Sequence, residues 1–315
     1  MKILFIDTVH PLLINELRAS GHDCVEGYEL TYEQIKANIS EFDGLVIRSR
    51  VQLDRKMLEH SKLKFIARAG AGMESIDVDF ARRKNIKCIN SPEGNRNAVA
   101  EHALGMLLML MNNLGRANNQ VREGKWLREP NRGHELRGLT VGIIGFGNMG
   151  SAFAEILSGF GIRILAFDKY KSGFGTETIK EATLVEVMNE ADVLSIHVPL
   201  TSETEYLVND EFINSCRKNF YFINTARGKC VRTDDLVRHL RSGKIMGACL
   251  DVIEYEDLSF EKFSLKSYLD NPSWLYLTNS NKVILTPHIA GWSFESHERI
   301  SKVLFEKITT LGRGI

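Results

Sequence analysis

The sequence predicts an α/β protein with two domains, each built on a parallel sheet. Two observations predict this fold class. Short apolar runs alternate with helical patterns along most of the 315 residues, and a glycine-rich turn directly follows one of these runs. Alternating strands and helices form right-handed βαβ units, which place their strands in parallel sheets.

The first part of the chain contains four apolar runs that are typical of buried parallel strands. These runs cover residues 2–7, 44–49, 64–70 and 86–90. Stretches with helical spacing lie between them, for example at residues 10–21 and 53–61.

A second series of six apolar runs follows and predicts a second parallel sheet. The runs cover residues 140–145, 162–168, 192–198, 221–226, 246–252 and 283–288. Helical patterns separate these runs too, for example at residues 148–161 and 232–244.

A long apolar stretch at residues 97–120 predicts one helix between the two series. At the end of the chain, residues 293–312 are amphipathic and predict a helix that packs back on the first domain. We therefore expect a smaller, discontinuous domain of residues 1–95 completed by residues 292–315. The second domain is expected at residues 96–291.

Charge and hydropathy narrow the class of protein. Hydrophobic residues make up 43% of the chain and charged residues 25%, as in globular proteins. Lysine and arginine number 40, as do aspartate and glutamate, so no basic excess attracts nucleic acid or an anionic membrane. The apolar start is interrupted at Asp7 and His10, which indicates a strand rather than a signal peptide. We expect neither nucleic acid nor a membrane as a partner.

The cysteines lack the spacing of a metal site or a disulfide framework. They are Cys24, Cys88, Cys216, Cys230 and Cys249. An odd number of cysteines without C-x-x-C pairs favours free thiols, so we expect no bound metal. Free thiols are typical of a reducing compartment, and the cytoplasm is the expected location.

Residues 145–150 fit the pattern G-x-G-x-x-G between an apolar run and a helical stretch. Gly145 permits a tight turn, Gly147 lets the backbone approach a pyrophosphate, and Gly150 lets helix and strand pack closely. The N–H groups at the start of the helix suit the negative charge of that pyrophosphate. The pattern therefore predicts a Rossmann domain that binds a dinucleotide.

The strand after this helix ends in Asp168. Its carboxylate can accept hydrogen bonds from the adenosine ribose and would repel a 2′-phosphate. Lys169 and Lys171 follow it and weaken this preference a little. We expect NAD rather than NADP as the cofactor.

Three ionisable residues follow three different predicted strands. They are Arg227, Glu256 and His288. In an open α/β sheet, ligands bind outside the carboxyl ends of the strands, so these residues can converge on one crevice.

The chemistry of alcohol oxidation beside a carboxylate gives each of the three a role. We assign His288 as acid and base, because the pKa of histidine lies near neutral pH. Glu256 would raise that pKa and fix the ring tautomer, and Arg227 would bind the substrate carboxylate with its planar fork. Each residue alone also fits a surface role, and it is their coincidence with the dinucleotide pattern that favours catalysis.

The chain resembles the D-isomer-specific 2-hydroxyacid dehydrogenase family over essentially its whole length. The segments that carry the resemblance occur in the family's order at residues 46–50, 67–79, 90–108, 141–150, 197–201, 223–228, 250–256 and 286–291. Within the family the chain is most similar to the phosphoglycerate dehydrogenases. This implies oxidation of 3-phosphoglycerate to 3-phosphohydroxypyruvate in serine biosynthesis. It also implies a homodimer formed through the cofactor domain near the helix after Asn95.

The resemblance implies site residues beyond the triad of Arg227, Glu256 and His288. On the substrate side these are Arg48, Ser49, Ala69, Gly70, Ala71, Gly72 and Asn95. On the cofactor side they are Gly145, Gly147, Asn148, Met149, Gly150, Asp168, His197, Val198, Pro199, Thr204, Thr225, Ala226, Asp251 and Gly291.

The chain departs from the family after Glu256, where Asp257 replaces the usual proline and residues 257–282 form a long polar segment. The sequence ends at Ile315, so we expect no regulatory domain for serine feedback. Arg48, Arg50, Arg128 and Arg132 fit either a phosphate site or a charged surface. Hydroxypyruvate, glyoxylate and D-lactate stay open as substrates, and a NAD(H)-sensing, corepressor-like binding protein is the alternative of another class.

Overall fold

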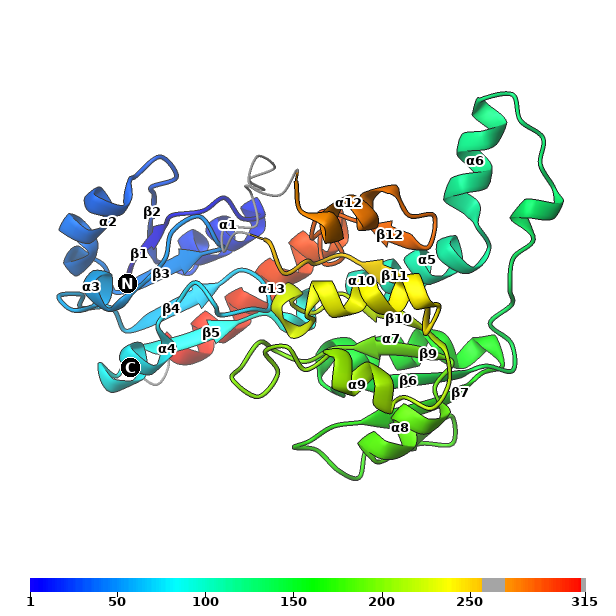
Figure 1. The fold of residues 1–315 in the computed structure, drawn as a ribbon. Helices are drawn as coiled ribbons and strands as arrows, with labels where there is room; N and C mark the ends of the chain where they lie inside the picture. The colour runs from blue at the N-terminus through cyan, green and yellow to red at the C-terminus, as the bar shows by residue number, and fades with distance from the viewer. Residues whose placement is uncertain (257–269, 313–315) are drawn as a thin grey trace. The chain divides into compact units, whose positions relative to one another are not determined.

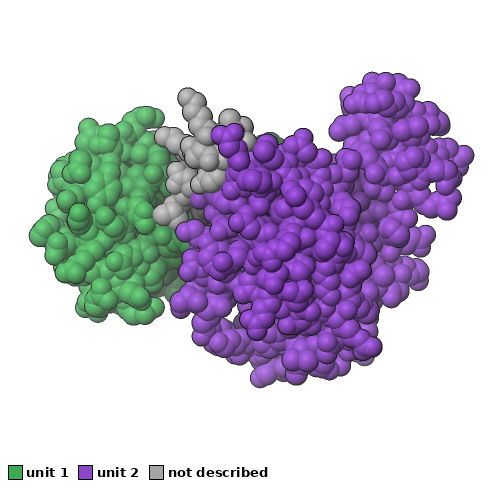
Figure 2. Space-filling view, in the orientation of Figure 1, with its two compact units in different colours: residues 1–96, 257–262, 292–315 green, residues 97–256, 263–291 purple. Residues whose placement is uncertain are grey.

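The computed structural model describes residues 1–256 and 270–312. The chain divides into two compact units, which Figure 2 colours separately. Among the described residues, unit 1 holds 1–96 and 292–312, and unit 2 holds 97–256 and 270–291. Each unit is an α/β structure on a parallel sheet, so the predicted fold class is confirmed.

Unit 1 has a five-stranded parallel sheet of order β2-β1-β3-β4-β5. The strands are β1 (Lys2–Phe5), β2 (Asp23–Glu26), β3 (Gly44–Ile47), β4 (Phe65–Arg68) and β5 (Lys87–Asn90). The helices are α1 (Pro11–Ala19), α2 (Tyr32–Asn38), α3 (Arg55–Leu58), α4 (Val78–Arg83), the start of α5 (Pro92–Met111) and α13 (Phe294–Gly312). The four predicted apolar runs form β1, β3, β4 and β5.

The C-terminal helix α13 completes the core of unit 1. Its residues Ile300, Leu304 and Ile308 are buried in one hydrophobic cluster with Leu13 and Leu17 of α1. Burial of such a stripe supplies most of the stability of an amphipathic helix. Figure 1 shows α13 in red.

Unit 2 has a seven-stranded parallel sheet of order β12-β11-β10-β9-β6-β7-β8. The strands are β6 (Thr140–Ile144), β7 (Arg163–Phe167), β8 (Ile179–Glu181), β9 (Val193–Ile196), β10 (Phe220–Asn224), β11 (Ile245–Leu250) and β12 (Val283–Leu285). Apart from α5 its helices are α6 (Leu114–Arg122), α7 (Asn148–Leu157), α8 (Leu184–Glu190), α9 (Asp210–Ser215), α10 (Thr233–Ser242) and α12 (Pro272–Asn279).

The single helix predicted at residues 97–120 is wrong, because the chain forms α5 and α6 with a break at Asn112 and Asn113. Asn113 has a φ of 54°, in the left-handed region that asparagine tolerates better than most residues. Figure 1 shows α6 and the segment after it extending away from the sheet of unit 2.

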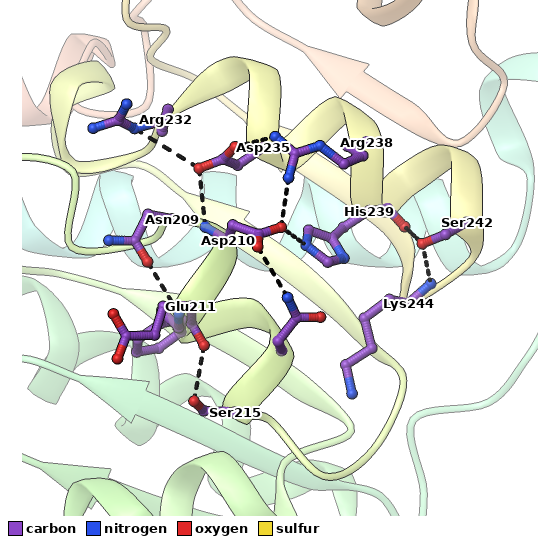
Figure 3. A network of polar contacts seen from close by, with 12 residues as sticks. Asn209, Asp210, Glu211, Ser215, Arg232, Asp235, Arg238, His239, Ser242 and Lys244 are labelled. Atoms are coloured by element: carbon purple, nitrogen blue, oxygen red, sulfur yellow. Dashed lines mark hydrogen bonds and ion pairs between the residues drawn. The ribbon is translucent and has the colours of Figure 1, made fainter.

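A network of charged groups joins α9 to α10 (Figure 3). The Asp210 carboxylate accepts hydrogen bonds from Arg238 at 2.6 Å and His239 at 2.8 Å. Asp235 accepts the backbone N–H of Asp210 at 2.9 Å. The hydrogen bond from His239, together with the charge of Arg238, lowers the pKa of Asp210. The network fixes the helix that follows the loop of Arg227.

All five cysteines are free thiols, and burial raises the pKa of Cys216 to about 11. Among the described residues, no helix is long and apolar enough to cross a membrane.

Candidate active site

The order of strands in unit 2 reverses at the boundary between β6 and β9. β7 and β8 lie on one side of β6, and β9 to β12 lie on the other. The loops after β6 and β9 leave this boundary in opposite directions, which opens the crevice where doubly wound sheets bind dinucleotides. The backbone N–H of His197, just after β9, donates to the carbonyl of Ile144 at 2.8 Å.

The glycines at residues 145–150 directly follow β6, at the point where the strand order reverses. Gly145 has a φ of 92°, and a Cβ there would lie 2.7 Å from the carbonyl oxygen of His197. A Cβ on Gly150 would overlap the carbonyl of Gly145, whereas a Cβ on Gly147 would point into open space. Gly147 therefore lies where a side chain would fill the space that a pyrophosphate needs, and α7 begins at the next residue. These residues fit a bound NAD.

Asp168 follows β7 and already organises the loops around it. Its Oδ2 accepts the backbone N–H of Phe146 at 2.7 Å. Its Oδ1 accepts the N–H groups of Tyr170 at 2.9 Å and Lys171 at 3.1 Å. A carboxylate has about four acceptor positions, so a ribose hydroxyl can still donate to it.

His197 is held as a neutral ring beside the glycine loop. Its Nε2 lies 2.8 Å from the hydroxyl of Ser195, and its ring packs on Phe153. Burial lowers the pKa of His197 to about 4. Its Nδ1 is buried without a partner among the described residues, as is the hydroxyl of Thr225 after β10. These two atoms lie on the loops after β9 and β10, and buried polar atoms without a partner are rare in proteins.

The remaining cofactor residues implied by the resemblance follow β6, β9, β10 and β12. Asn148 and Met149 form the first turn of α7, Val198, Pro199 and Thr204 follow β9, Ala226 follows β10, and Gly291 follows β12. Thr204 has a clear local role, because its hydroxyl donates to the carbonyl of Pro199 at 2.6 Å and accepts the N–H of Thr201 at 2.8 Å. Their contact with cofactor stays a prediction.

The three candidate catalytic residues follow three adjacent strands. In the sheet register Asn224 of β10 pairs with Leu250 of β11, and Leu250 pairs with Leu285 of β12. The loops that follow these strands therefore begin side by side at one edge of the sheet.

The loop of Arg227 is fixed by its neighbours. The buried side chain of Asn224 accepts the N–H of Ala226 and donates to the carbonyl of Arg227, each at 3.0 Å. The next residue is Gly228, where a Cβ would overlap the carbonyl of Ile253 in the loop of Glu256. Glycine at 228 thus lets the loops of Arg227 and Glu256 approach each other closely.

Glu256 and His288 form a direct pair. The His288 Nδ1 lies 2.6 Å from the Glu256 Oε2, with both side chains largely buried. The other Glu256 oxygen accepts the backbone N–H of Ile253. A carboxylate at Nδ1 holds the proton on that nitrogen, which makes Nε2 of the neutral ring the proton acceptor. The pair has the geometry of a base that is oriented by an acid.

Asp251 anchors the loop that carries His288. Its two carboxylate oxygens accept the hydroxyl of Thr286 at 2.6 Å and the N–H groups of Ile289 and Ala290, each at 2.8 Å. Its own carbonyl accepts the N–H of His288 at 2.8 Å. The resemblance assigns Asp251 to the cofactor, and the structure gives it this anchoring role.

The substrate residues implied by the resemblance lie in unit 1. The backbone N–H of Arg48 donates to the buried carboxylate of Asp7 at 2.5 Å, and Ser49 follows in the same loop. Arg50 is committed to the protein: it donates to the carbonyls of Ile6 and Leu30 and lies 3.3 Å from Asp7. Arg50 therefore stabilises this loop through its own contacts and is not a cation directed at a phosphate.

Two residues of unit 1, His297 and Trp292, were missed by sequence reasoning. His297 of α13 has a buried Nε2 without a partner among the described residues, as does the Oδ1 of Asn95. The ring of Trp292 lies 5.4 Å from the His297 ring and 4.2 Å from the guanidinium carbon of Arg48. Burial and the charge of Arg48 lower the pKa of His297. The only signal in the sequence is an aromatic and a histidine near the start of an amphipathic helix, which is also typical of a core.

Other expected positions are less informative. Ala71 has its carbonyl held by the side chain of Asn90 at 2.5 Å, and Gly72 follows it. Arg132 pairs with Glu129 at 2.7 Å on the surface of the arm after α6. Asp257 lies outside the described residues. The substrate residues belong to unit 1 and the triad to unit 2, and the structure describes each group within its own unit.

Comparison with known proteins points to one family. The model of the D-isomer specific 2-hydroxyacid dehydrogenase NAD binding domain matches residues 104–290. A hydroxypyruvate reductase of Thermotoga maritima is 36% identical over 90% of each chain. A D-3-phosphoglycerate dehydrogenase of Methanocaldococcus jannaschii is 33% identical, and the match covers 100% of this chain but 58% of that protein. The crystal structure of a D-lactate dehydrogenase from Aquifex aeolicus, complexed with NAD and lactic acid, superposes with a TM-score of 0.83 at 29% identity, covering 100% of this chain and 96% of that one.

Proposed function

Because the chain belongs to the D-isomer specific 2-hydroxyacid dehydrogenase family of NAD-dependent oxidoreductases that act on CH–OH groups, we propose that it interconverts 3-phosphoglycerate and 3-phosphohydroxypyruvate, a step that leads to serine. The observation that carries the proposal is the His288–Glu256 pair. It lies past the carboxyl ends of adjacent strands, where the loop of Arg227 also begins. These three residues supply a base, a carboxylate that orients it and a cation for the substrate carboxylate.

In the proposed reaction, NAD supplies the hydride acceptor. The Nε2 of His288 removes the hydroxyl proton as the alcohol becomes a ketone, and it returns a proton in the reverse direction. Glu256 stabilises the imidazolium that forms, because its carboxylate lies 2.6 Å from Nδ1. Arg227 binds the substrate carboxylate through its fork, which places the carbon to be oxidised beside the cofactor crevice.

The substrate loop of unit 1 supports a charged substrate. The guanidinium carbon of Arg48 lies over the ring of Trp292, 4.2 Å from its centre, in a cation–π contact that favours this position of the charge. Asn95 and His297 add buried polar atoms of the kind that hydroxyl or phosphate groups pair with. Together with Ser49, Ala71 and Gly72, they are the residues that we propose for the part of the substrate beyond its carboxylate.

A second candidate substrate is hydroxypyruvate, without the phosphate. It is favoured by Arg50, whose donors are already satisfied by Ile6, Leu30 and Asp7 and which therefore adds no cation for a phosphate. The relative from Thermotoga maritima, which carries the name hydroxypyruvate reductase, supports this candidate because it is 36% identical over 90% of each chain.

A substrate panel tests the proposal. Purified protein is assayed with NAD(H) and 3-phosphoglycerate, 3-phosphohydroxypyruvate, hydroxypyruvate, glyoxylate and pyruvate. We expect the highest kcat/KM for the phosphorylated pair. A higher kcat/KM for hydroxypyruvate would select the second candidate, and no turnover of any of the five would refute the enzyme reading.

His288→Ala tests the role of His288 as acid and base. We expect kcat to fall by roughly 10²–10⁴-fold, because a positioned general base contributes about that much. The dissociation constant of NADH should stay within about twofold, since the ring of His288 faces Glu256 rather than the glycine loop. Unchanged turnover would remove His288 from its role.

The proposal includes a homodimer and a cytoplasmic location. The exposed apolar residues of α6 and the arm after it support the dimer, and five free thiols fit a reducing compartment.

A further inference from the structure

Two loops flank Asp168, the residue that is expected to bind the adenosine ribose. One loop follows β7 and contains Lys169 and Tyr170, and the other follows β9 and contains Glu203. The Lys169 Nζ lies 2.7 Å from the Glu203 Oε2, and the hydroxyl of Tyr170 donates to the same oxygen at 2.5 Å. One carboxylate thus joins the two loops beside the ribose position.

Lys169 is the cation best placed to bind a 2′-phosphate. Rossmann domains that accept NADP place a basic group beside the residue that otherwise binds the 2′-hydroxyl. Lys169 directly follows Asp168 in the chain, so its charge is the nearest in sequence to that position. Lys171, the other basic residue of the loop, points its Nζ at the carbonyl of Phe146 at 3.3 Å.

Glu203 already pairs with Lys169, whose positive charge a 2′-phosphate would need. The hydrogen bond from Lys169 and its positive charge lower the pKa of Glu203, and the same bond raises the pKa of Lys169. Both groups are therefore charged at neutral pH, and their charges cancel. A phosphate arriving at this position meets the carboxylate of Asp168 and a lysine that is already paired.

We propose that Glu203 is a cofactor-selecting residue, which favours NAD over NADP by neutralising Lys169 beside Asp168. Two effects then favour NAD over NADP. Asp168 repels the 2′-phosphate, and Glu203 neutralises the lysine that would offset this repulsion. The inference concerns the cofactor and so goes beyond the proposed substrate reaction. It does not depend on which hydroxy acid is oxidised.

The test is direct binding of reduced cofactors to the folded protein, measured by the fluorescence of NADH and NADPH at low ionic strength. In Glu203→Gln we expect the dissociation constant of NADPH to fall by roughly 5–10-fold, because an unpaired lysine then faces a phosphate with about two negative charges. The dissociation constant of NADH should change by less than about twofold. The gain should shrink in 0.5 M salt, since salt screens exposed charges.

Two controls separate the pair from a general change of charge. Glu205→Gln removes the same charge from the same exposed loop without touching Lys169, and it should leave both dissociation constants near wild type. Adding Lys169→Gln to Glu203→Gln should abolish the gain for NADPH. An equal gain in Glu205→Gln, or no gain in Glu203→Gln, would overturn the proposal.

Discussion

At the residue scale, the buried carboxylate of Asp7 fixes the loop of Arg48 through two contacts. One oxygen accepts the backbone N–H of Arg48 at 2.5 Å, and the other lies 3.3 Å from the Nε of Arg50. In addition, the side chain of Arg68 donates to the carbonyl of Arg48 at 3.3 Å. A buried charge that is paired and hydrogen-bonded in this way sets the backbone firmly.

Asp7→Asn should therefore weaken substrate binding more than it slows the chemical step. An amide cannot accept from Arg48 and Arg50 as two negative oxygens do, so the loop loses one of its anchors. We expect KM for the hydroxy acid to rise by about tenfold or more while kcat changes by less than about threefold. Steady-state kinetics at saturating NADH measures both.

Asp43→Asn is the matched control for this substitution. Asp43 accepts the backbone N–H of Lys2 at 2.8 Å and pairs with Lys64 in the same unit, at the amino ends of the strands. We expect it to lower stability and leave KM unchanged. If Asp43→Asn raised KM as much as Asp7→Asn, the specific role of Asp7 would be lost. A wild-type protein without activity would instead refute the proposed function and would say nothing of Asp7.

Single residues show where sequence reasoning stops. The three candidate catalytic residues stand out in the sequence because each follows an apolar run, and runs of parallel strands end at one edge. Asp7 was recognised only as the end of a strand, and Arg50 was taken as a candidate phosphate ligand. Their roles depend on partners about forty positions away in the chain, and no local pattern records such a contact.

At the scale of elements, helix α5 packs one of its glycines against the backbone of α13. A Cβ on Gly94 would lie 2.6 Å from the Cα and the nitrogen of Ile300. Nearby, Arg299 donates to the carbonyl of Gly94 at 3.1 Å, and Lys307 pairs with Glu93 at 2.9 Å. The contact needs a residue without a side chain.

Gly94→Ala should destabilise the protein by about 1–3 kcal/mol, because backbone atoms cannot move aside as a side chain can. Gly105→Ala lies on the same helix, where a Cβ would meet nothing within 4 Å. There alanine should stabilise by about 0.5–1 kcal/mol through its higher helix propensity. Urea unfolding of both variants measures the sign of the change in the free energy of unfolding at each position. A loss of stability at both positions would contradict the packing argument.

The elements that the sequence did not reveal have different physical causes. β2 and β8 lie at the edges of their sheets, but so do β5 and β12, which were predicted. What distinguishes β2 and β8 is that their sequences, DCVE and IKE, have no apolar run. The break between α5 and α6 was missed because asparagine is compatible with a helix, and only the left-handed conformation of Asn113 ends it.

At the scale of the whole molecule, the arm around α6 presents an apolar surface that unit 2 does not cover. Its exposed residues are Leu114, Val121, Trp126 and Leu127, with Trp126 exposed to 79%. Exposed apolar patches of this kind mark interfaces. We expect them to lie in the interface of the proposed homodimer.

Charges on the arm should therefore break the dimer. We expect wild-type protein to sediment as a dimer at micromolar concentration and Val121→Glu with Trp126→Glu to sediment as a monomer, since burying two carboxylates costs several kcal/mol. Val185→Glu is the control, because Val185 is 65% exposed on α8 outside the arm. A monomeric wild type, or the same loss of dimer in the control, would refute this interface.

The backbone of His288 conflicts with the catalytic role that we propose for its side chain. Its φ of 55° lies in the left-handed region, and its N–H is held there by the carbonyls of Asp251 and Thr286. Non-glycine residues pay roughly 1–2 kcal/mol in that conformation. Glycine would suit the backbone at position 288 better, but it has no imidazole to exchange a proton. With the proposed role of His288, selection for stability alone would replace the residue that selection for activity keeps, so this position sets a limit on how stable an active form of the protein can become.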